Sequence, residues 1–78
     1  MTWVYILRCS DDSFYVGHTD DLGGRERTHN DGGGARYTAA RRPVRLVHSE
    51  QFDHVEQAIA RERQLKRWSA GKKNALLN

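Results

Sequence analysis

The segment VEQAIARERQLKRW, residues 55–68, combines a helical apolar pattern with an acidic residue inside that pattern. At 3.6 residues per turn, one stripe that should face a core contains four apolar side chains: Val55, Ala58, Ile59 and Leu65. Glu62 falls inside this stripe, where an ionised carboxylate is unfavourable unless a cation or hydrogen-bond donors meet it. Two interpretations follow. Glu62 either reaches water or pairs with Arg61 or Lys66 at the edge of the stripe, or it serves a site.

The chain has 78 residues, enough for one domain (residues 1–78) with two or three layers around a small core. Its one cysteine, Cys9, excludes an internal disulfide and a cysteine-based zinc site, and fits a reducing compartment. No apolar run approaches the ~20 residues that span a bilayer. The first ten residues lack the basic leader and cleavage site of a signal peptide. We therefore expect a cytoplasmic protein without a membrane segment.

Charge is divided unevenly along the chain. Residues 1–34 carry three basic and six acidic side chains, whereas residues 35–78 carry ten basic and four acidic ones. A basic half of this kind suits a polyanion such as nucleic acid. The alternative is that these arginines and lysines are solvated charges on amphipathic helices.

Three stretches, residues 2–9, 14–17 and 44–49, are rich in β-branched and aromatic side chains and are predicted to be strands. The first is apolar on both faces, which predicts a central strand covered on two sides. The turn-forming residues 10–13 that follow it are few enough to favour an antiparallel hairpin. Gly17, at the end of the second strand, suggests a close backbone approach or a bend.

A helix is expected after Thr19 or Asp20, either of which can cap it, and the glycine-rich residues 30–34 end it. Gly23 and Gly24 weaken this helix by ~1 kcal/mol each relative to alanine.

Asp53 and Glu56 form the pattern of a capping box, so the main helix should begin there and run to about Trp68. Ser69 can cap a short final helix. Residues 35–42 are expected to form a basic loop or a short helical turn. The predicted fold is therefore α+β, with the order β-β-α-β-α-α.

Two tyrosines, Tyr5 and Tyr15, lie ten residues apart in the predicted hairpin, and Arg25 and His29 follow on one helix face. With the later Glu62, this arrangement resembles the GIY-YIG nuclease family over nearly the whole chain. The two tripeptides of the family name correspond to residues 3–5 (WVY) and 15–17 (YVG). The spacings from Tyr15 to Arg25 and His29, ten and fourteen residues, also match.

The family's later A-x-x-x-E-x-x-x-K segment corresponds to Ala58, Glu62 and Lys66. Within the family the chain is most similar to short stand-alone bacterial proteins, whose pattern includes Tyr37-Thr38, Arg42-Pro43, Arg61-Glu62, Lys72 and Lys73. Three features depart from the family pattern: Trp3 replaces the first glycine, Glu26 stands at a usually apolar position, and Gly23-Gly24 interrupt a helix.

The resemblance implies a small three-stranded antiparallel sheet flanked by helices, and phosphodiester cleavage with one divalent cation, Mg²⁺ or Mn²⁺. A single carboxylate such as Glu62 can hold such a cation when water and substrate phosphate supply the other ligands. Arg25 offers a fork of donors to phosphate oxygens. Tyr5 or Tyr15 would act as general base, directly or through water. The resemblance favours Tyr5, with the other tyrosine holding the attacking water or the phosphate.

Two histidines complete the expected site. His29 would hydrogen-bond a tyrosine or the phosphate, and His18 would assist the nucleophile. Asn74 corresponds to an asparagine that contacts metal or phosphate in some relatives.

DNA is the expected partner, branched or flapped, cleaved in repair or processing with structure selectivity or weak sequence specificity. Eight basic residues would contact its phosphates without reading sequence: Arg36, Arg41, Arg42, Arg45, Arg63, Arg67, Lys72 and Lys73. The alternative function is a non-catalytic nucleic-acid-binding module of the same fold. In either case a protein partner could direct it to its target.

Overall fold

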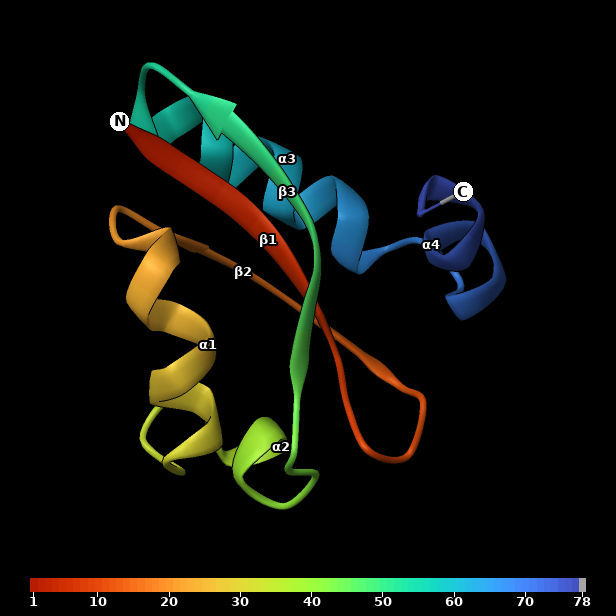
Figure 1. The fold of residues 1–78 in the computed structure, drawn as a ribbon. Coiled ribbons are helices and arrows are strands. Elements are labelled where there is room, and N and C mark those ends of the chain that lie inside the picture. Colours follow the sequence, from red (N-terminus) through yellow and green to blue (C-terminus); the bar gives the residue numbers. More distant parts are fainter. Residues whose placement is uncertain (78) are drawn as a thin grey trace.

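A three-stranded antiparallel sheet forms the centre of the protein in the computed structural model, which describes residues 1–77 (Figure 1). Its strands are β1 (Thr2–Arg8), β2 (Phe14–Thr19) and β3 (Arg45–Phe52), in the order β2-β1-β3. The central place of β1 confirms the prediction made from its two apolar faces. β2 and β3 extend further than the sequence pattern indicated, to Thr19 and Phe52.

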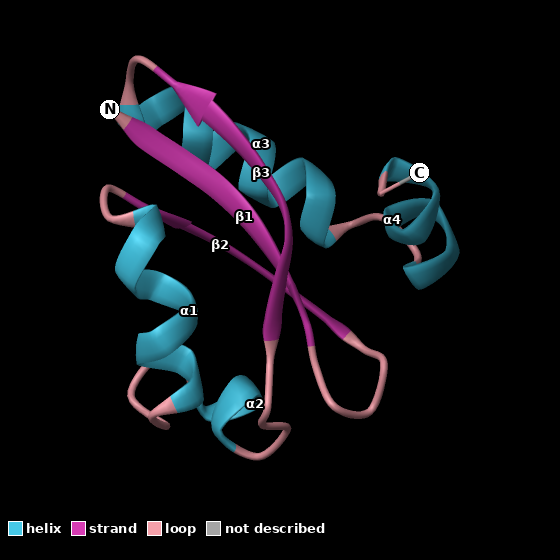
Figure 2. Ribbon diagram, in the orientation of Figure 1, coloured by secondary structure: helices cyan, strands magenta, loops and turns pink. Residues whose placement is uncertain are grey.

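Helices cover both faces of this sheet (Figure 2). They are α1 (Leu22–Asn30), α2 (Arg36–Ala39), α3 (Val55–Lys66) and α4 (Ala70–Leu76). The α+β fold and the order β-β-α-β-α-α are confirmed. α2 is added as one short turn within the segment expected to be a loop or a helical turn. Within residues 1–77, no helix is both long and apolar enough to cross a membrane.

The predicted starts of two helices were displaced by one or two residues. α1 is capped by Asp21, whose carboxylate accepts a hydrogen bond from the Gly24 amide at 3.3 Å, and not by Thr19 or Asp20. The Thr19 hydroxyl instead accepts from the Asp21 amide at 3.0 Å. This bond fixes the turn between β2 and α1.

The capping box of α3 also lies one residue later than predicted. The Gln57 side chain accepts from the His54 amide at 3.3 Å, so His54 and not Asp53 precedes the first turn. α3 ends at Lys66, two residues before the predicted end. Ser69 caps α4 as predicted, with its hydroxyl 3.1 Å from the Lys72 amide.

Two apolar clusters, one on each face of the sheet, form the core. On one face, Val4 and Ile6 of β1 pack with Val16, Ala58 and Leu65. On the other, Tyr5 and Leu7 pack with Cys9 and Val44, and Leu22 of α1 lies against them. Both faces of β1 are therefore apolar and covered, as predicted.

The apolar stripe of α3 was predicted one turn too long. Ala58 and Leu65 are fully buried and Ile59 is half-buried, but Val55 is 44% exposed. Val55 begins the helix beside Thr2, at the end of the sheet and outside both apolar clusters. Glu62, inside the stripe, keeps only 14% of its side chain exposed.

Candidate active site

Tyr5 and His29 meet on the face of the sheet that α1 covers. Tyr5 Oη lies 2.9 Å from His29 Nε2, and the exposed fractions of the two residues are 3% and 1%. Gly17 is opposite Tyr5 in the β1–β2 ladder, and a β-carbon at Gly17 would lie 2.5 Å from Tyr5 Oη. Glycine at this position therefore lets the phenol lie across β2, which is the close approach predicted from the sequence.

Tyr15 lies beside the same pair. Its ring centroid is 6.4 Å from that of Tyr5 and 5.1 Å from that of His29. Tyr37 of α2 stacks against Tyr15 at 6.3 Å, and the Arg41 guanidinium covers the Tyr37 ring at 3.8 Å. An aromatic row thus leads from the buried Tyr5 to α2.

A cavity of about 260 Å³ opens beside this row. It is lined by three aromatic residues, two lysines and a valine: Phe14, Tyr15, Tyr37, Lys66, Lys73 and Val16. Aromatic faces next to ammonium groups suit a ligand with flat rings and negative charge.

Glu62 projects from α3 between His18 and Lys66. Its Oε1 is hydrogen-bonded to His18 Nδ1, and its Oε2 lies 2.7 Å from Lys66 Nζ. Burial alone would raise the pKa of Glu62, but the hydrogen bonds and the charges of Lys66 and His18 together outweigh burial and hold its pKa below the usual value. The pairing with Lys66 is one of the two interpretations of this glutamate. The contact with His18 was not foreseen.

Arg25 is anchored at the end of β2. Its Nε and Nη2 donate to Thr19 Oγ1 at 3.2 and 3.0 Å, which leaves the other N–H groups of the fork for a ligand. Arg25 also lines a cavity of about 430 Å³ together with His18, Thr2, Thr19, Asp20 and Val55. His18 therefore connects the Arg25 cavity to Glu62.

The charges of Arg25 and Glu62 act on the pKa of Tyr5 in opposite directions. Burial raises the pKa of Tyr5 to about 12; Tyr15 and Glu62 add to the rise and Arg25 opposes it. Burial lowers the pKa of His29, and the positive charge of Arg25 lowers it further. Tyr5 is thus a neutral phenol and His29 a neutral imidazole at pH 7.

The six predicted catalytic residues occupy both faces of the edge strand β2. Tyr5, Tyr15 and His29 form one group on the α1 face. His18 and Glu62 form a second group on the α3 face, and Arg25 reaches the end of the strand from α1. The sequence did not single out Thr19, Tyr37, Thr38 or Lys66 as site residues. Tyr37 and Thr38 belong to the pattern of the short stand-alone proteins, and Lys66, four residues after Glu62 on a helix, carried a signal from helical geometry.

The eight predicted phosphate-binding residues are spread over several elements. Lys73 lines the cavity beside Tyr15. Arg41 is engaged by Asp11 at 3.1 Å, Arg42 donates to the Ala39 carbonyl at 3.0 Å, and Lys72 lies over the Trp68 ring at 4.3 Å. The remaining four are exposed: Arg36, Arg45, Arg63 and Arg67. The amide oxygen of the further candidate Asn74 accepts a hydrogen bond from Arg8 at 2.8 Å.

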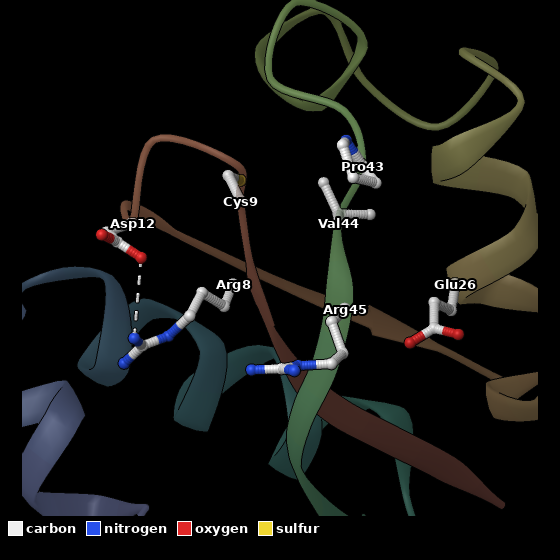
Figure 3. A pocket seen from close by; sticks show the side chains of 7 residues that line it. All are labelled: Arg8, Cys9, Asp12, Glu26, Pro43, Val44 and Arg45. Atoms are coloured by element: carbon white, nitrogen blue, oxygen red, sulfur yellow. Dashed lines mark ion pairs between the residues drawn. The ribbon is translucent and has the colours of Figure 1, made fainter.

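A cavity of about 440 Å³ lies away from the predicted catalytic residues, between the end of β1, the start of β3, and α1 (Figure 3). Its charged lining residues are Arg8, Asp12, Glu26 and Arg45, and no predicted catalytic residue lines it. Glu26 accepts a hydrogen bond from the Leu46 amide at 2.6 Å. This carboxylate joins α1 to β3, which accounts for an acid at a position where the family pattern has an apolar residue.

Glu62 is the residue at this site with the chemistry to hold Mg²⁺ or Mn²⁺. Residues 1–77 contain no group of three or more His, Cys, Asp or Glu side chains able to hold a metal. Mg²⁺ is commonly bound through one or two carboxylates, with water and substrate phosphate as its other ligands. The residues present fit a cation bound in that way, in place of the contacts that His18 and Lys66 make with the carboxylate oxygens.

Comparison with known proteins gives relatives along nearly the whole chain. A UPF0213 protein of Haloquadratum walsbyi is 49% identical over 74 residues, which cover 95% of this chain and 83% of the relative. A UPF0213 protein of Bacillus velezensis is 48% identical over 69 residues, covering 88% and 70%. These relatives come from archaea as well as bacteria, so the group is wider than the bacterial one that the sequence suggested.

A solved structure has the same fold. The solution NMR structure of a UPF0213 protein from Bacillus halodurans superposes with a TM-score of 0.62 at 42% identity, covering 99% of this chain and 83% of that one. The family model described as the GIY-YIG catalytic domain matches residues 1–74, a range that includes all six predicted catalytic residues. The chain therefore belongs to the GIY-YIG catalytic domain family.

Proposed function

We propose that this protein is a single-domain endonuclease of residues 1–78 that hydrolyses DNA phosphodiester bonds. Its proposed substrates are branched or flapped DNA, met in the cytoplasm during repair or processing. The observation that carries the proposal is the contact of Tyr5 Oη with His29 Nε2 at 2.9 Å, within reach of the charges of Arg25 and Glu62. A phenol, a neutral imidazole, a guanidinium and a carboxylate can together supply the proton transfer, the stabilisation of charge and the metal ligand that support phosphodiester hydrolysis.

Tyr5 acts in this proposal as a proton relay. A phenol with a pKa of about 12 is not ionised at neutral pH, so Tyr5 is not a phenolate before the reaction begins. It can accept a proton from water while passing its own proton to His29 Nε2, which is already within hydrogen-bond distance. The proton then resides on His29 as imidazolium, and Tyr5 is again neutral. Tyr15, beside both rings, holds the attacking water or the phosphate.

The remaining groups act on the phosphate. The water oxygen forms a new bond to phosphorus, the bond from phosphorus to the leaving oxygen breaks, and that oxygen takes a proton from solvent. Arg25, anchored by Thr19, donates to the non-bridging oxygens, where negative charge develops. Glu62 would hold Mg²⁺ or Mn²⁺, which when bound offsets charge at the phosphate and leaving group.

The cavity beside Tyr15 supports a substrate with unpaired bases. Aromatic side chains stack on unpaired bases of any sequence, and lysines neutralise the backbone phosphates between them. Phe14, Tyr15 and Tyr37 supply the rings, and Lys66 and Lys73 supply the charges. These groups favour recognition of shape over recognition of sequence.

A cleavage assay with a matched control tests the proposal. Labelled flap, fork, single-stranded and duplex DNA are incubated with Mg²⁺ or Mn²⁺ and wild-type, Glu62→Gln or Glu56→Gln protein. Glu56 is an exposed glutamate on the same helix and serves as the control. We expect Glu62→Gln to lower the cleavage rate by about 100-fold or more and Glu56→Gln to leave it unchanged. Equal cleavage by wild-type and Glu62→Gln protein would contradict the proposal.

One observation favours the second candidate, a nucleic-acid-binding module that cleaves nothing alone. His18 and Lys66 engage both oxygens of Glu62, so the carboxylate is closed to a cation in this state. Fluorescence anisotropy on the same DNA substrates separates the two functions. Binding by the wild-type protein without cleavage, with either metal, would establish the module.

A further inference from the structure

Thr38 of α2 is fully buried against His29, although the proposed reaction gives it no part. Its Oγ1 lies 2.7 Å from His29 Nδ1 and 3.1 Å from the Ala35 carbonyl oxygen. We infer that Thr38 is a positioning residue that fixes the tautomer of His29, so that the Nε2 lone pair faces Tyr5. The inference rests on the proposed function, since it assigns Thr38 a part in the same proton path.

The direction of the hydrogen bonds follows from counting protons. Thr38 has one hydroxyl hydrogen, and the Ala35 carbonyl oxygen, which can only accept, lies 3.1 Å from Oγ1 and can take that hydrogen. Thr38 Oγ1 then accepts from His29, so Nδ1 carries the imidazole proton. Nε2 is left as an acceptor for the Tyr5 hydroxyl. The hydroxyl groups of Tyr5 and Thr38 and the Nδ1–H group of His29 then each have an acceptor.

The opposite direction leaves a donor without a partner. If Nε2 carried the proton, it would donate to Tyr5 Oη, and Thr38 would turn from Ala35 to donate to Nδ1. Within residues 1–77, Tyr5 Oη has His29 as its one hydrogen-bond partner, so the buried phenol proton would have no acceptor on the protein. A buried donor without a protein partner is costly, and the Thr38 bond to Ala35 would be lost as well.

The surroundings of His29 leave Thr38 as the group that controls Nδ1. His29 is 1% exposed, and a β-carbon at Gly34 would lie 2.2 Å from Nδ1. The backbone of the glycine loop is therefore pressed against the ring beside this nitrogen, where a water molecule would need space.

The tautomer decides whether His29 can act. With the proton on Nδ1, Nε2 can take the Tyr5 proton at the moment Tyr5 accepts one from water. With the proton on Nε2, the imidazole donates to Tyr5 and the relay is blocked. Thr38 therefore affects the chemistry through His29, without touching Tyr5 or the substrate.

The first experiment measures the tautomer directly. A ¹H–¹⁵N NMR spectrum of ¹⁵N-histidine-labelled wild-type protein at neutral pH reports which ring nitrogen of His29 is protonated. We expect the Nδ1–H form. The Nε2–H form would overturn the inference whether or not the protein cleaves DNA. An Nδ1–H form in a protein without nuclease activity would refute the proposed function and leave the Thr38 assignment standing.

The second experiment compares Thr38→Val with Thr38→Ser. Valine keeps the shape and removes the hydroxyl, whereas serine keeps the hydroxyl. We expect Thr38→Val to lower kcat for flap cleavage by about 10- to 100-fold with KM unchanged, and to bring the Nε2–H form into the NMR spectrum. Thr38→Ser should keep kcat within about threefold of wild type. An unchanged kcat and an unchanged tautomer in Thr38→Val would overturn the inference.

Discussion

Gly17 and Tyr5 face each other across the β1–β2 ladder so closely that a β-carbon at Gly17 would lie 2.5 Å from the phenol oxygen and 2.7 Å from Cζ. The phenol is buried and hydrogen-bonded to His29, so it has no free space into which to retreat. The glycine of the second tripeptide thus makes room for the tyrosine of the first. The two tripeptides depend on each other through this contact.

Gly17→Ala should therefore damage both stability and cleavage. Overpacking a buried contact of this kind costs about 1–3 kcal/mol of the free energy of unfolding. The displaced phenol would also lose its alignment with His29, so the cleavage rate should fall by about 100-fold. Urea denaturation and the flap assay measure the two effects.

Gly23→Ala is the matched control for Gly17→Ala. A β-carbon at Gly23 meets no atom within 4 Å, and the residue lies in the first turn of α1. Alanine there should raise the free energy of unfolding by up to about 1 kcal/mol and leave cleavage unchanged. Equal effects of the two substitutions would show that the Tyr5 contact is not what requires glycine at position 17.

Tyr5 should ionise only in strongly alkaline solution. Its pKa is about 12 in the folded protein, against 10.0 for an ordinary tyrosine. Because the unfolded chain loses the phenol proton first, the contribution of the buried phenol to stability is complete below pH 10 and is lost as the pH rises through about 12. Absorbance at ~295 nm, where tyrosinate absorbs, should show one late-titrating tyrosine that is missing from Tyr5→Phe. Titration of every tyrosine near pH 10 would contradict this expectation.

His29 should remain neutral below the ordinary histidine pKa of 6.5. Burial and the charge of Arg25 lower its folded pKa, so the unfolded chain takes up the proton first. Its contribution to stability is therefore complete above pH 6.5 and declines as the pH falls through the lower folded pKa. Cleavage should persist below pH 6.5 for the same reason, because the proton acceptor is still free. NMR titration of the His29 ring measures this pKa, and a value above 6.5 would contradict the expected sign.

Lys73 should contribute to DNA binding through the cavity beside Tyr15. Lys73→Ala is expected to weaken binding to all sequences and to lower the slope of log affinity against log salt by about one. Lys72, its neighbour on α4, lies over the Trp68 ring, so Lys72→Ala should change the slope less. Anisotropy titrations at several salt concentrations measure both slopes. A larger loss with Lys72→Ala would place the DNA on the other side of α4.

The sequence predicted the sheet because its signals are local. The apolar residues on both faces of β1 predict a central strand, and the short turn after it predicts the hairpin. The helix starts were displaced because several residues of similar capping ability stand side by side, as with Thr19, Asp20 and Asp21. Tertiary contacts decide among such neighbours. Here Thr19 is already engaged by the Arg25 side chain.

The polar links of the site could be predicted only in part. Glu62 and Lys66 are four residues apart on one helix, so their pairing follows from helical geometry. The contacts of Glu62 with His18, and of His29 with Thr38, join different elements. No helix or strand period relates these residues, so the sequence pattern could not predict the contacts. The tyrosines were found through the resemblance, since an aromatic residue in a small hairpin is otherwise an ordinary core residue.

Successive side chains of β2 face opposite sides of the sheet, and this alternation limits where residues can be inserted or deleted without disturbing the site. Tyr15 and Gly17 face Tyr5 on one side of this strand, and His18 faces Glu62 on the other. One residue inserted or deleted within 15–18 would exchange these sides and separate the phenols from the acid. The hairpin turn at residues 10–13 lies outside this alternation, so extra residues there would leave both groups in place. Variation in length among natural sequences should therefore collect in that turn and be absent from the strand.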